Sequence, residues 1–329
     1  RVFTYCEIAN DWNTTQDLVN LQYTQFISRA EWRDGLMRHS SNDHLPDGWG
    51  SLKNDPEGRR VWMGIAGEEV TGFDFSREAF IGPNGSYAAP AAVVNGACTD
   101  QEGWTDNACG GMQVDLDLAP GETKEIRVLL GVGKAETVGK ERFARFSSAE
   151  AFEAELARVK ERWHSELGAF EVQTPDPEFD SMVNVWNAYN CLITYNWSRA
   201  ASLIYNGERD GLGFRDSVQD VLGALPMIPE ACRERLELML TGQRSTGGAM
   251  PVVQPFNHHP GKESPPPGDA YRSDDCLWFF NAVPAYVAET GDVGFYRKVL
   301  SYADKGEATV LAHLRRALEF NLERSGAHG

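Results

Sequence analysis

Arginine, aspartate and glycine residues concentrate in one stretch of the chain, residues 196–217, and their chemistry suits a polar ligand. The stretch contains three arginines, two aspartates and three glycines: Arg199, Arg209, Arg215, Asp210, Asp216, Gly207, Gly211 and Gly213. Glycine lets the backbone turn tightly, arginine donates hydrogen bonds and aspartate accepts them. A sugar needs both partners, because its hydroxyl groups donate and accept. A solvated loop between two helices, with surface ion pairs, is the alternative interpretation.

Other groups of polar residues favour structural roles. Gly211-Leu212-Gly213 is not a nucleotide-binding motif, because neither G-x-G-x-x-G after a strand nor G-x-x-x-x-G-K-(S/T) is present. The side chains of the adjacent His258 and His259 diverge, and the nearby acids lack a known ligand spacing, so no metal site is predicted. Asp274 and Asp275 precede a predicted helix and are interpreted as an N-cap and a first-turn acid.

Charge and composition exclude several kinds of partner. The chain has 31 basic and 48 acidic residues, a net charge of −17, which repels nucleic acid and anionic membrane surfaces. A small anion can still bind where several arginines converge, because its binding depends on the local charge rather than on the net charge of the chain. Six cysteines without a C-x-x-C pair are expected to be free thiols in a reducing cytoplasm. The chain starts in strand-like sequence without an initiator methionine or a signal peptide, so we expect a cytoplasmic fragment.

Residues 1–137 are predicted to be a β-sandwich domain whose first strands lie before Arg1. Short apolar segments such as 2–8 and 61–65 are separated by Gly, Pro, Asn and Asp, as is typical of strands in a sandwich. Apolar and polar residues alternate at 112–118 and 126–130, on either side of a turn at 119–122. This pattern predicts an antiparallel hairpin.

Helical patterns dominate after residue 137. Ser147 and Glu150 form an S-x-x-E capping box ahead of apolar residues at helical spacing, so 138–175 is predicted to be a helical linker. Residues 176–329 are predicted to be all-α. Helices are expected at about 180–197, 230–242, 276–290 and 306–324, with Pro229 before the second, and Gly291 and Gly326 after the last two. The proline-rich segment 258–268 is predicted to be a loop.

Three stretches resemble the cellobiose and N,N′-diacetylchitobiose phosphorylases of glycoside hydrolase family 94. They are SRAASLIYNGERDGLGFRDSVQD, YRSDDCLWFFNAVPAYVAETGD and GFDFSREAFIGP, and the G-x-G-(F/W/Y)-R-D-S run with its upstream S-R is specific. The resemblance implies a β-sandwich, a helical linker and an (α/α) six-hairpin toroid, of which 176–329 would be the first part. It also implies an inverting disaccharide phosphorylase, a glycosyltransferase that cleaves a β-glucosyl or β-N-acetylglucosaminyl disaccharide with inorganic phosphate to give a sugar 1-phosphate.

The same resemblance assigns roles to individual residues. Arg199 matches an arginine that binds phosphate, and Arg209 and Asp216 match the pair that holds the non-reducing sugar, with Arg215 in the same substrate-binding run. The spacing of seven residues between Arg209 and Asp216 is similar to the chitobiose type, and Asp210 stands where the cellobiose pattern has its arginine. Phosphate is a co-substrate, and no cofactor or metal is expected. The full-length protein is expected to be a homodimer.

The general acid is expected beyond Gly329. In the family it is an aspartate of an Ala-Asp-Trp-Asn-Asp motif that follows a segment like SGAHG, whereas Asp11-Trp12-Asn13 lies in the predicted sandwich. The phosphate-binding histidine and serine or threonine are also expected beyond the end. An inverting hydrolase needs an acid and a base, but a phosphorylase needs only the acid, because phosphate is already an anionic nucleophile. The chain alone is therefore predicted to be inactive.

Two other functions remain alternatives: an inverting glycoside hydrolase on the same barrel, and a non-catalytic carbohydrate-binding sandwich with a helical appendage. The cluster of Arg199, Arg209 and Asp216 argues against the second, since a sandwich-only binder would not need it in its helical part. The sequence does not identify the disaccharide, its linkage or the acceptor sugar. It also leaves open whether glucose or N-acetylglucosamine occupies the non-reducing subsite.

Overall fold

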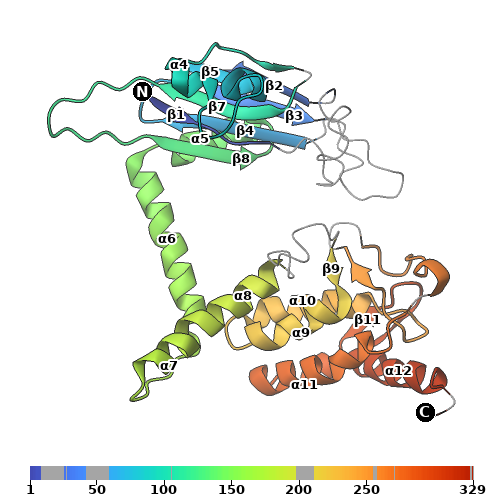
Figure 1. The fold of residues 1–329 in the computed structure, drawn as a ribbon. Helices are drawn as coiled ribbons and strands as arrows, with labels where there is room; N and C mark the ends of the chain where they lie inside the picture. The colour runs from blue at the N-terminus through green and yellow to red at the C-terminus, as the bar shows by residue number, and fades with distance from the viewer. Residues whose placement is uncertain are drawn as a thin grey trace. The chain divides into compact units, whose positions relative to one another are not determined.

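The chain forms two compact units, Arg1–Val159 and Lys160–Gly329. The computed structural model describes residues 1–8, 26, 28–41, 59–104, 106–197, 211–254, 258–269, 271–326 and 328. The first unit is rich in β-sheet and the second is mainly helical (Figure 1). All six cysteines are free thiols, as predicted.

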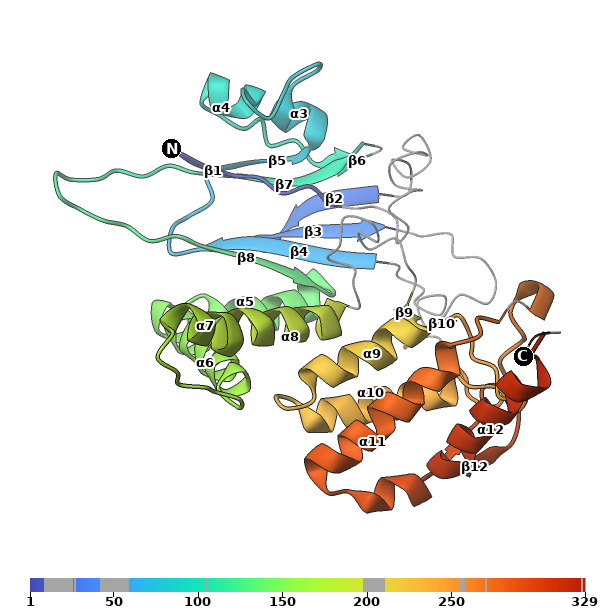
Figure 2. The same ribbon diagram turned by 60° about the horizontal axis from the view of Figure 1, so that its bottom comes forward.

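Two antiparallel sheets build the first unit (Figure 2). One contains, in spatial order, β1 (Val2–Thr4), β7 (Ala108–Val114) and β5 (Gly72–Ser76). The other contains β6 (Gly103–Trp104), β2 (Ser28–Arg33), β3 (Leu36–Ser41), β4 (Arg59–Ala66) and β8 (Arg127–Val132).

The two sheets share one hydrophobic core. Met37 and Met63 from the five-stranded sheet belong to the same buried cluster as Phe75 and Met112 from the three-stranded sheet. Because alternate side chains of a strand point to opposite faces, this cluster identifies the inner face of each sheet. The β-sandwich predicted for the N-terminal part is therefore confirmed.

Strand β7 is buried along its whole length. Two short helices, α3 (Arg77–Ile81) and α4 (Ala91–Asn95), contribute Phe80 and Ala92 to a second cluster that includes Cys109 of β7. The three-stranded sheet thus has a core on both faces. This explains why β7 lacks the exposed polar residues of a strand with one solvated face.

Strands β7 and β8 do not form the predicted hairpin. The chain does turn at 119–122, where the Glu122 N–H donates to the Ala119 carbonyl at 2.9 Å. However, β7 pairs with β1 and β5, whereas β8 pairs with β4 in the other sheet. The prediction was wrong because alternation identifies the two faces of a strand but not its neighbour, and the connection over 115–126 passes from one sheet to the other.

Helix α6 (Ala149–Leu167) confirms the helix predicted in the linker, but its cap is shifted by one residue. Ser148 Oγ accepts a hydrogen bond from the Ala151 N–H at 3.1 Å, the bond assigned in the prediction to Ser147. The Ser147 N–H instead donates to the Phe143 carbonyl and ends α5 (Lys140–Phe146). A helix directly upstream, which follows the π-helical segment Ala135–Gly139, therefore takes Ser147 as its own C-cap.

The helices of the second unit pack around one core. α7 (Pro177–Ser181), the π-helical segment Met182–Asn187 and α8 (Ala188–Trp197) follow one another without a break. They are followed by α9 (Phe214–Ala224), α10 (Pro229–Thr241), α11 (Phe279–Thr290) and α12 (Val310–Glu323). Phe214, Leu236, Phe279 and Leu314 belong to the shared buried cluster, and α9 contacts α8, α10 and α11 (Figure 1).

Some of the predicted elements differ from the structure. Helix α9 was not predicted, because the stretch up to Ser217 was interpreted as a region between two helices and the next helix was expected only at about 230. The last helix begins at Val310 rather than near 306, because β12 (Glu307–Thr309) first pairs with β11 (Val299–Ser301). The proline-rich segment is a loop as predicted, apart from a single 3₁₀ turn, Pro267–Asp269.

Candidate functional site

A short two-stranded antiparallel sheet fixes the start of α9. In β9 (Leu212–Gly213) and β10 (Val252–Val253), Gly213 lies opposite Val252. The Phe214 N–H donates to the Pro251 carbonyl at 3.1 Å. Gly211 precedes β9 with a φ of +109°, and a Cβ at that position would lie 2.7 Å from the Val253 carbonyl oxygen. Glycine is therefore required where the chain enters the site.

Strand β9 leads directly into α9, so Arg215 and Asp216 lie in the first turn of this helix. An acidic residue there is favoured by the helix dipole, which is the structural reason for Asp216 at this position. Arg199, Arg209 and Asp210 lie outside the described residues. The predicted convergence of Arg199 and Arg209 on Asp216 therefore stays a prediction.

Arg215 is bound by Asp274, which comes from a different part of the chain. Arg215 Nη1 lies 3.0 Å from Asp274 Oδ1 and 2.9 Å from Oδ2. Asp274 Oδ2 also accepts a hydrogen bond from Trp278 Nε1 at 3.3 Å. Asp274 is the N-cap residue and Asp275 the first-turn acid of the 3₁₀ segment Asp275–Trp278 that leads into α11, as predicted, but the Asp274 side chain makes no capping hydrogen bond. The carboxylate instead joins that segment to α9.

The neighbouring carboxyl groups of Asp274 and Asp275 have opposite environments. Burial opposes ionisation of Asp274, but hydrogen bonds from Arg215 and Trp278 hold its pKa below the ordinary value. Asp275 is fully buried, and neither of its oxygens has a hydrogen-bond partner among the described residues. Burial, reinforced by the charge of Asp274 and opposed by Arg272, raises the pKa of Asp275 to about 6. Asp274 is thus the more acidic member of the pair.

The exposed part of this cluster suits hydroxyl groups. The side chains of Arg215 and Asp274 are 42% and 41% exposed, so a ligand can reach them. Within the described ranges, Arg215 uses only Nη1 for its hydrogen bonds, which leaves the donors on Nε and Nη2 for a ligand. With the carboxylate of Asp216 beside it, this arrangement can donate to and accept from a sugar.

Asp220 was not singled out in the sequence. It lies one turn after Asp216 on α9, at a spacing that places both side chains on one face of the helix, and it is 8% exposed. Two aspartates four residues apart can share one face of a helix, so their spacing could have pointed to this pair. The pair was missed because no helix was predicted at residue 216.

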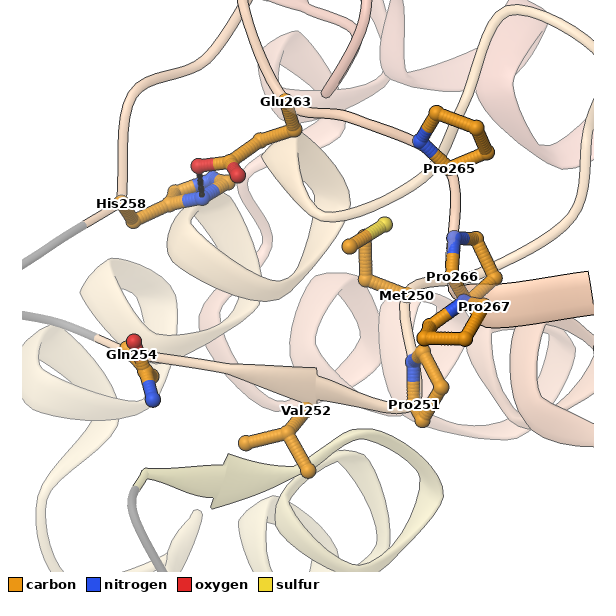
Figure 3. A pocket seen from close by; sticks show the side chains of 9 residues that line it. All are labelled: Met250, Pro251, Val252, Gln254, His258, Glu263, Pro265, Pro266 and Pro267. Carbon is orange, nitrogen blue, oxygen red and sulfur yellow. Dashed lines mark hydrogen bonds and ion pairs between the residues drawn. The ribbon is translucent and has the colours of Figure 1, made fainter. Parts of the chain in front are cut away.

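A pocket of about 300 Å³ lies next to β10. Figure 3 shows its lining residues: Met250, Pro251, Val252, Gln254, His258, Glu263, Pro265, Pro266 and Pro267. His258 Nδ1 lies 3.0 Å from Glu263 Oε1, and its Nε2 lies 3.0 Å from Thr241 Oγ1. Both ring nitrogens are therefore engaged by protein groups. Over the described parts of the chain, no three His, Cys, Asp or Glu residues are grouped so that they could hold a metal ion.

The fold and the site define a class of protein: a β-sandwich followed by a helical unit in which arginine and aspartate residues lie together at the start of one helix. Two family models match the chain in the same order. Residues 1–149 match the glycosyl hydrolase 94 supersandwich domain, and residues 162–329 match the catalytic domain of the glycosyl hydrolase 94 superfamily. The chain belongs to the glycosyl hydrolase 94 family.

Relatives in this family include phosphorylases of several disaccharides. The chain is 34% identical to an N,N′-diacetylchitobiose phosphorylase of Vibrio furnissii, over 99% of this chain and 41% of the relative. It is 32% identical to an N,N′-diacetylchitobiose phosphorylase of Vibrio proteolyticus, over 78% of this chain and 34% of the relative. A solabiose phosphorylase of Paenibacillus borealis is 26% identical over 80% of this chain and 32% of its own length. The matched part thus covers about a third to two fifths of the length of these relatives.

No helix within the described ranges is long and apolar enough to cross a membrane. The cytoplasmic location stays a prediction.

Proposed function

We propose that this chain is part of an inverting disaccharide phosphorylase of the length of its relatives, hereafter the full-length protein. The proposed reaction cleaves a β-linked glucosyl or N-acetylglucosaminyl disaccharide with inorganic phosphate and yields an α-sugar 1-phosphate and a free sugar. The observation that carries the proposal is the 34% identity to a chitobiose phosphorylase over 99% of this chain.

The described cluster supports a sugar subsite. Asp216 supplies a carboxylate and Arg215 supplies free guanidinium donors at the start of α9. Carboxylate oxygens accept from adjacent sugar hydroxyls, and a guanidinium donates to them. We assign Arg215 and Asp216, together with Arg209, to the non-reducing sugar.

The proposed chemistry needs one acid and an oriented phosphate. A phosphate oxygen attacks the anomeric carbon from the face opposite the glycosidic bond, which breaks as the acid protonates the departing oxygen. Phosphate is already anionic, so cationic side chains replace the base of a hydrolase. We assign Arg199 to phosphate. We place the general acid outside residues 1–329, because no Ala-Asp-Trp-Asn-Asp motif occurs in them.

We also propose that the helices from α7 onward are the first part of an (α/α) six-hairpin toroid, and that the full-length protein is a cytoplasmic homodimer. The contacts of α9 with α8, α10 and α11 support the helical packing. Light scattering of the purified full-length protein tests the oligomeric state.

The reaction is tested by incubating the full-length protein with N,N′-diacetylchitobiose or cellobiose, with and without phosphate. We expect an α-sugar 1-phosphate, identified by ³¹P and ¹H NMR, only when phosphate is present. Release of two free sugars at a rate independent of phosphate would instead identify an inverting hydrolase. Binding without turnover of either disaccharide would favour a non-catalytic carbohydrate-binding protein.

A further inference from the structure

Arg215 is held at one nitrogen only. Nη1 contacts both oxygens of Asp274, at 3.0 and 2.9 Å, while Nε and Nη2 have no partner among the described residues. A fork-to-fork pair would instead occupy two guanidinium nitrogens. The contact therefore restrains the side chain of Arg215 without using up its donors.

The carboxylate that holds Arg215 is itself held. Trp278 Nε1 donates to Asp274 Oδ2 at 3.3 Å, and Asp274 and Trp278 are the N-cap and the last residue of the short 3₁₀ segment that leads into α11. A long arginine side chain on a surface samples many rotamers, and each contact it makes with a ligand is weaker when that freedom must be lost on binding. A fixed carboxylate next to Nη1 removes much of that freedom in advance.

We propose that Asp274 is a positioning residue, which presents the free Nε and Nη2 donors of Arg215 to the non-reducing sugar through the chain Trp278–Asp274–Arg215. This inference rests on the proposed function of Arg215. The charge of the carboxylate is essential, because an ionised acceptor binds a guanidinium about twice as strongly as a neutral one.

A second pair in the same unit shows what a purely structural contact looks like. Asp292 lies 3.4 Å from Arg233 Nη1, and the same guanidinium also binds Glu237 through Nε at 2.9 Å. Arg233 is therefore shared between two acids of its own unit. Asp292→Asn is a matched control for Asp274→Asn, since each removes one charge from an arginine–aspartate pair.

The test is a double-mutant cycle in the full-length protein, with kcat/KM for the disaccharide measured for Arg215→Ala, Asp274→Asn and the double variant. We expect Asp274→Asn to lower kcat/KM about 10-fold or more, mainly through the KM for disaccharide, and to have almost no effect when Arg215 is already alanine. Asp292→Asn should leave kcat/KM unchanged. Urea midpoints of all variants establish that they fold.

Each result has a separate meaning. If Arg215→Ala leaves kcat/KM unchanged, the proposed sugar-binding role of Arg215 is wrong. If Arg215→Ala is impaired but Asp274→Asn is not, or the two losses multiply in the double variant, Arg215 binds the sugar and the positioning role of Asp274 is overturned. Should Asp274→Asn fail to fold, Trp278→Phe removes only the indole donor, and a loss of kcat/KM that disappears in the Arg215→Ala background supports the same conclusion.

Discussion

At the scale of residues, Asp274 and Asp275 show how one step along the chain changes the chemistry of a carboxyl group. Asp274 is partly exposed and accepts hydrogen bonds from Arg215 and Trp278. Asp275 is fully buried, and no described group donates to either of its oxygens. A buried charge without a partner costs free energy, whereas a hydrogen-bonded one is tolerated. In its ionised form Asp274 therefore stabilises the folded chain, whereas Asp275 destabilises it.

We expect Asp275→Asn to stabilise the chain at neutral and basic pH. The pKa of Asp275 is raised from the ordinary 3.8 to about 6 in the folded chain, so between these values the folded chain binds more protons than the unfolded one. The free energy of unfolding therefore falls as the pH rises through this window, by up to about 3 kcal/mol at about 1.4 kcal/mol per pKa unit. Asparagine does not ionise and avoids this loss.

The measurement is urea unfolding followed by tryptophan fluorescence at pH 5 and pH 8, with a larger gain expected at pH 8. Asp274→Asn is the control of opposite sign, because the pKa of Asp274 is lowered in the folded chain. The decrease in the free energy of unfolding caused by Asp274→Asn should be small, since the Asp274 side chain is 41% exposed. A loss of stability in Asp275→Asn at pH 8 would show that the carboxylate has a cationic partner.

Arg199 and Asp216 are expected to affect different substrates in the full-length protein. Arg199→Ala should raise the apparent KM for phosphate more than that for disaccharide, because a charge-assisted bond contributes about 1.5–3 kcal/mol. Asp216→Ala should lower kcat/KM for disaccharide by about 100-fold or more, since it removes contacts to the sugar that distorts in the transition state. Steady-state kinetics with each substrate varied separately checks both. Equal effects on both substrates would contradict the assignment.

At the scale of elements, α12 has apolar residues on its exposed side as well as on the side that packs into the core. Leu314 is 5% exposed and belongs to the core, whereas Leu311, Leu318 and Leu322 are 59%, 47% and 67% exposed. The three exposed leucines are spaced by seven and four residues, so they form one stripe along the helix. In a toroid such a stripe would be covered by a neighbouring helix.

We expect Leu318→Lys to change the free energy of unfolding of chain 1–329 by less than about 0.5 kcal/mol, as is usual for an exposed position. Leu314→Ala, the control in the same helix, should cost about 2–5 kcal/mol because it leaves a cavity. In the full-length protein the toroid proposal predicts that Leu318→Lys becomes destabilising by more than about 1 kcal/mol. The measurement is urea unfolding of chain 1–329 and of the full-length protein. If Leu318→Lys does not lower the free energy of unfolding of the full-length protein, no helix covers this stripe.

Local sequence patterns predicted where helices begin and end better than they predicted which strands or side chains contact one another. Pro229 and Gly291 correctly marked the start of α10 and the end of α11, because each has a strong local preference at a helix terminus. The pairing of β8 with β4, and of Arg215 with Asp274, depends on contacts between distant segments, which no local pattern specifies. Helix α9 was missed because the glycines and charged residues at 207–216 are typical of a loop.

At the scale of the whole molecule, each unit has its own hydrophobic core. The described sugar-binding candidates all lie in the helical unit, on α9 and at the start of α11. The sandwich supplies none of the assigned groups. The proposed activity therefore depends on the general acid that we place outside residues 1–329. A site with sugar contacts but no acid can bind a disaccharide without cleaving it.

Chain 1–329, expressed alone, is expected to show no phosphorolysis. General acid catalysis contributes about 100- to 10,000-fold, and the proposed acid and the remaining phosphate-binding groups lie outside these residues. The assay is sugar 1-phosphate formation from N,N′-diacetylchitobiose, with the full-length protein as the positive control. Disaccharide binding, measured by titration calorimetry, should survive in weakened form and should fall further in Asp216→Ala. Turnover by chain 1–329 would refute the placement of the acid.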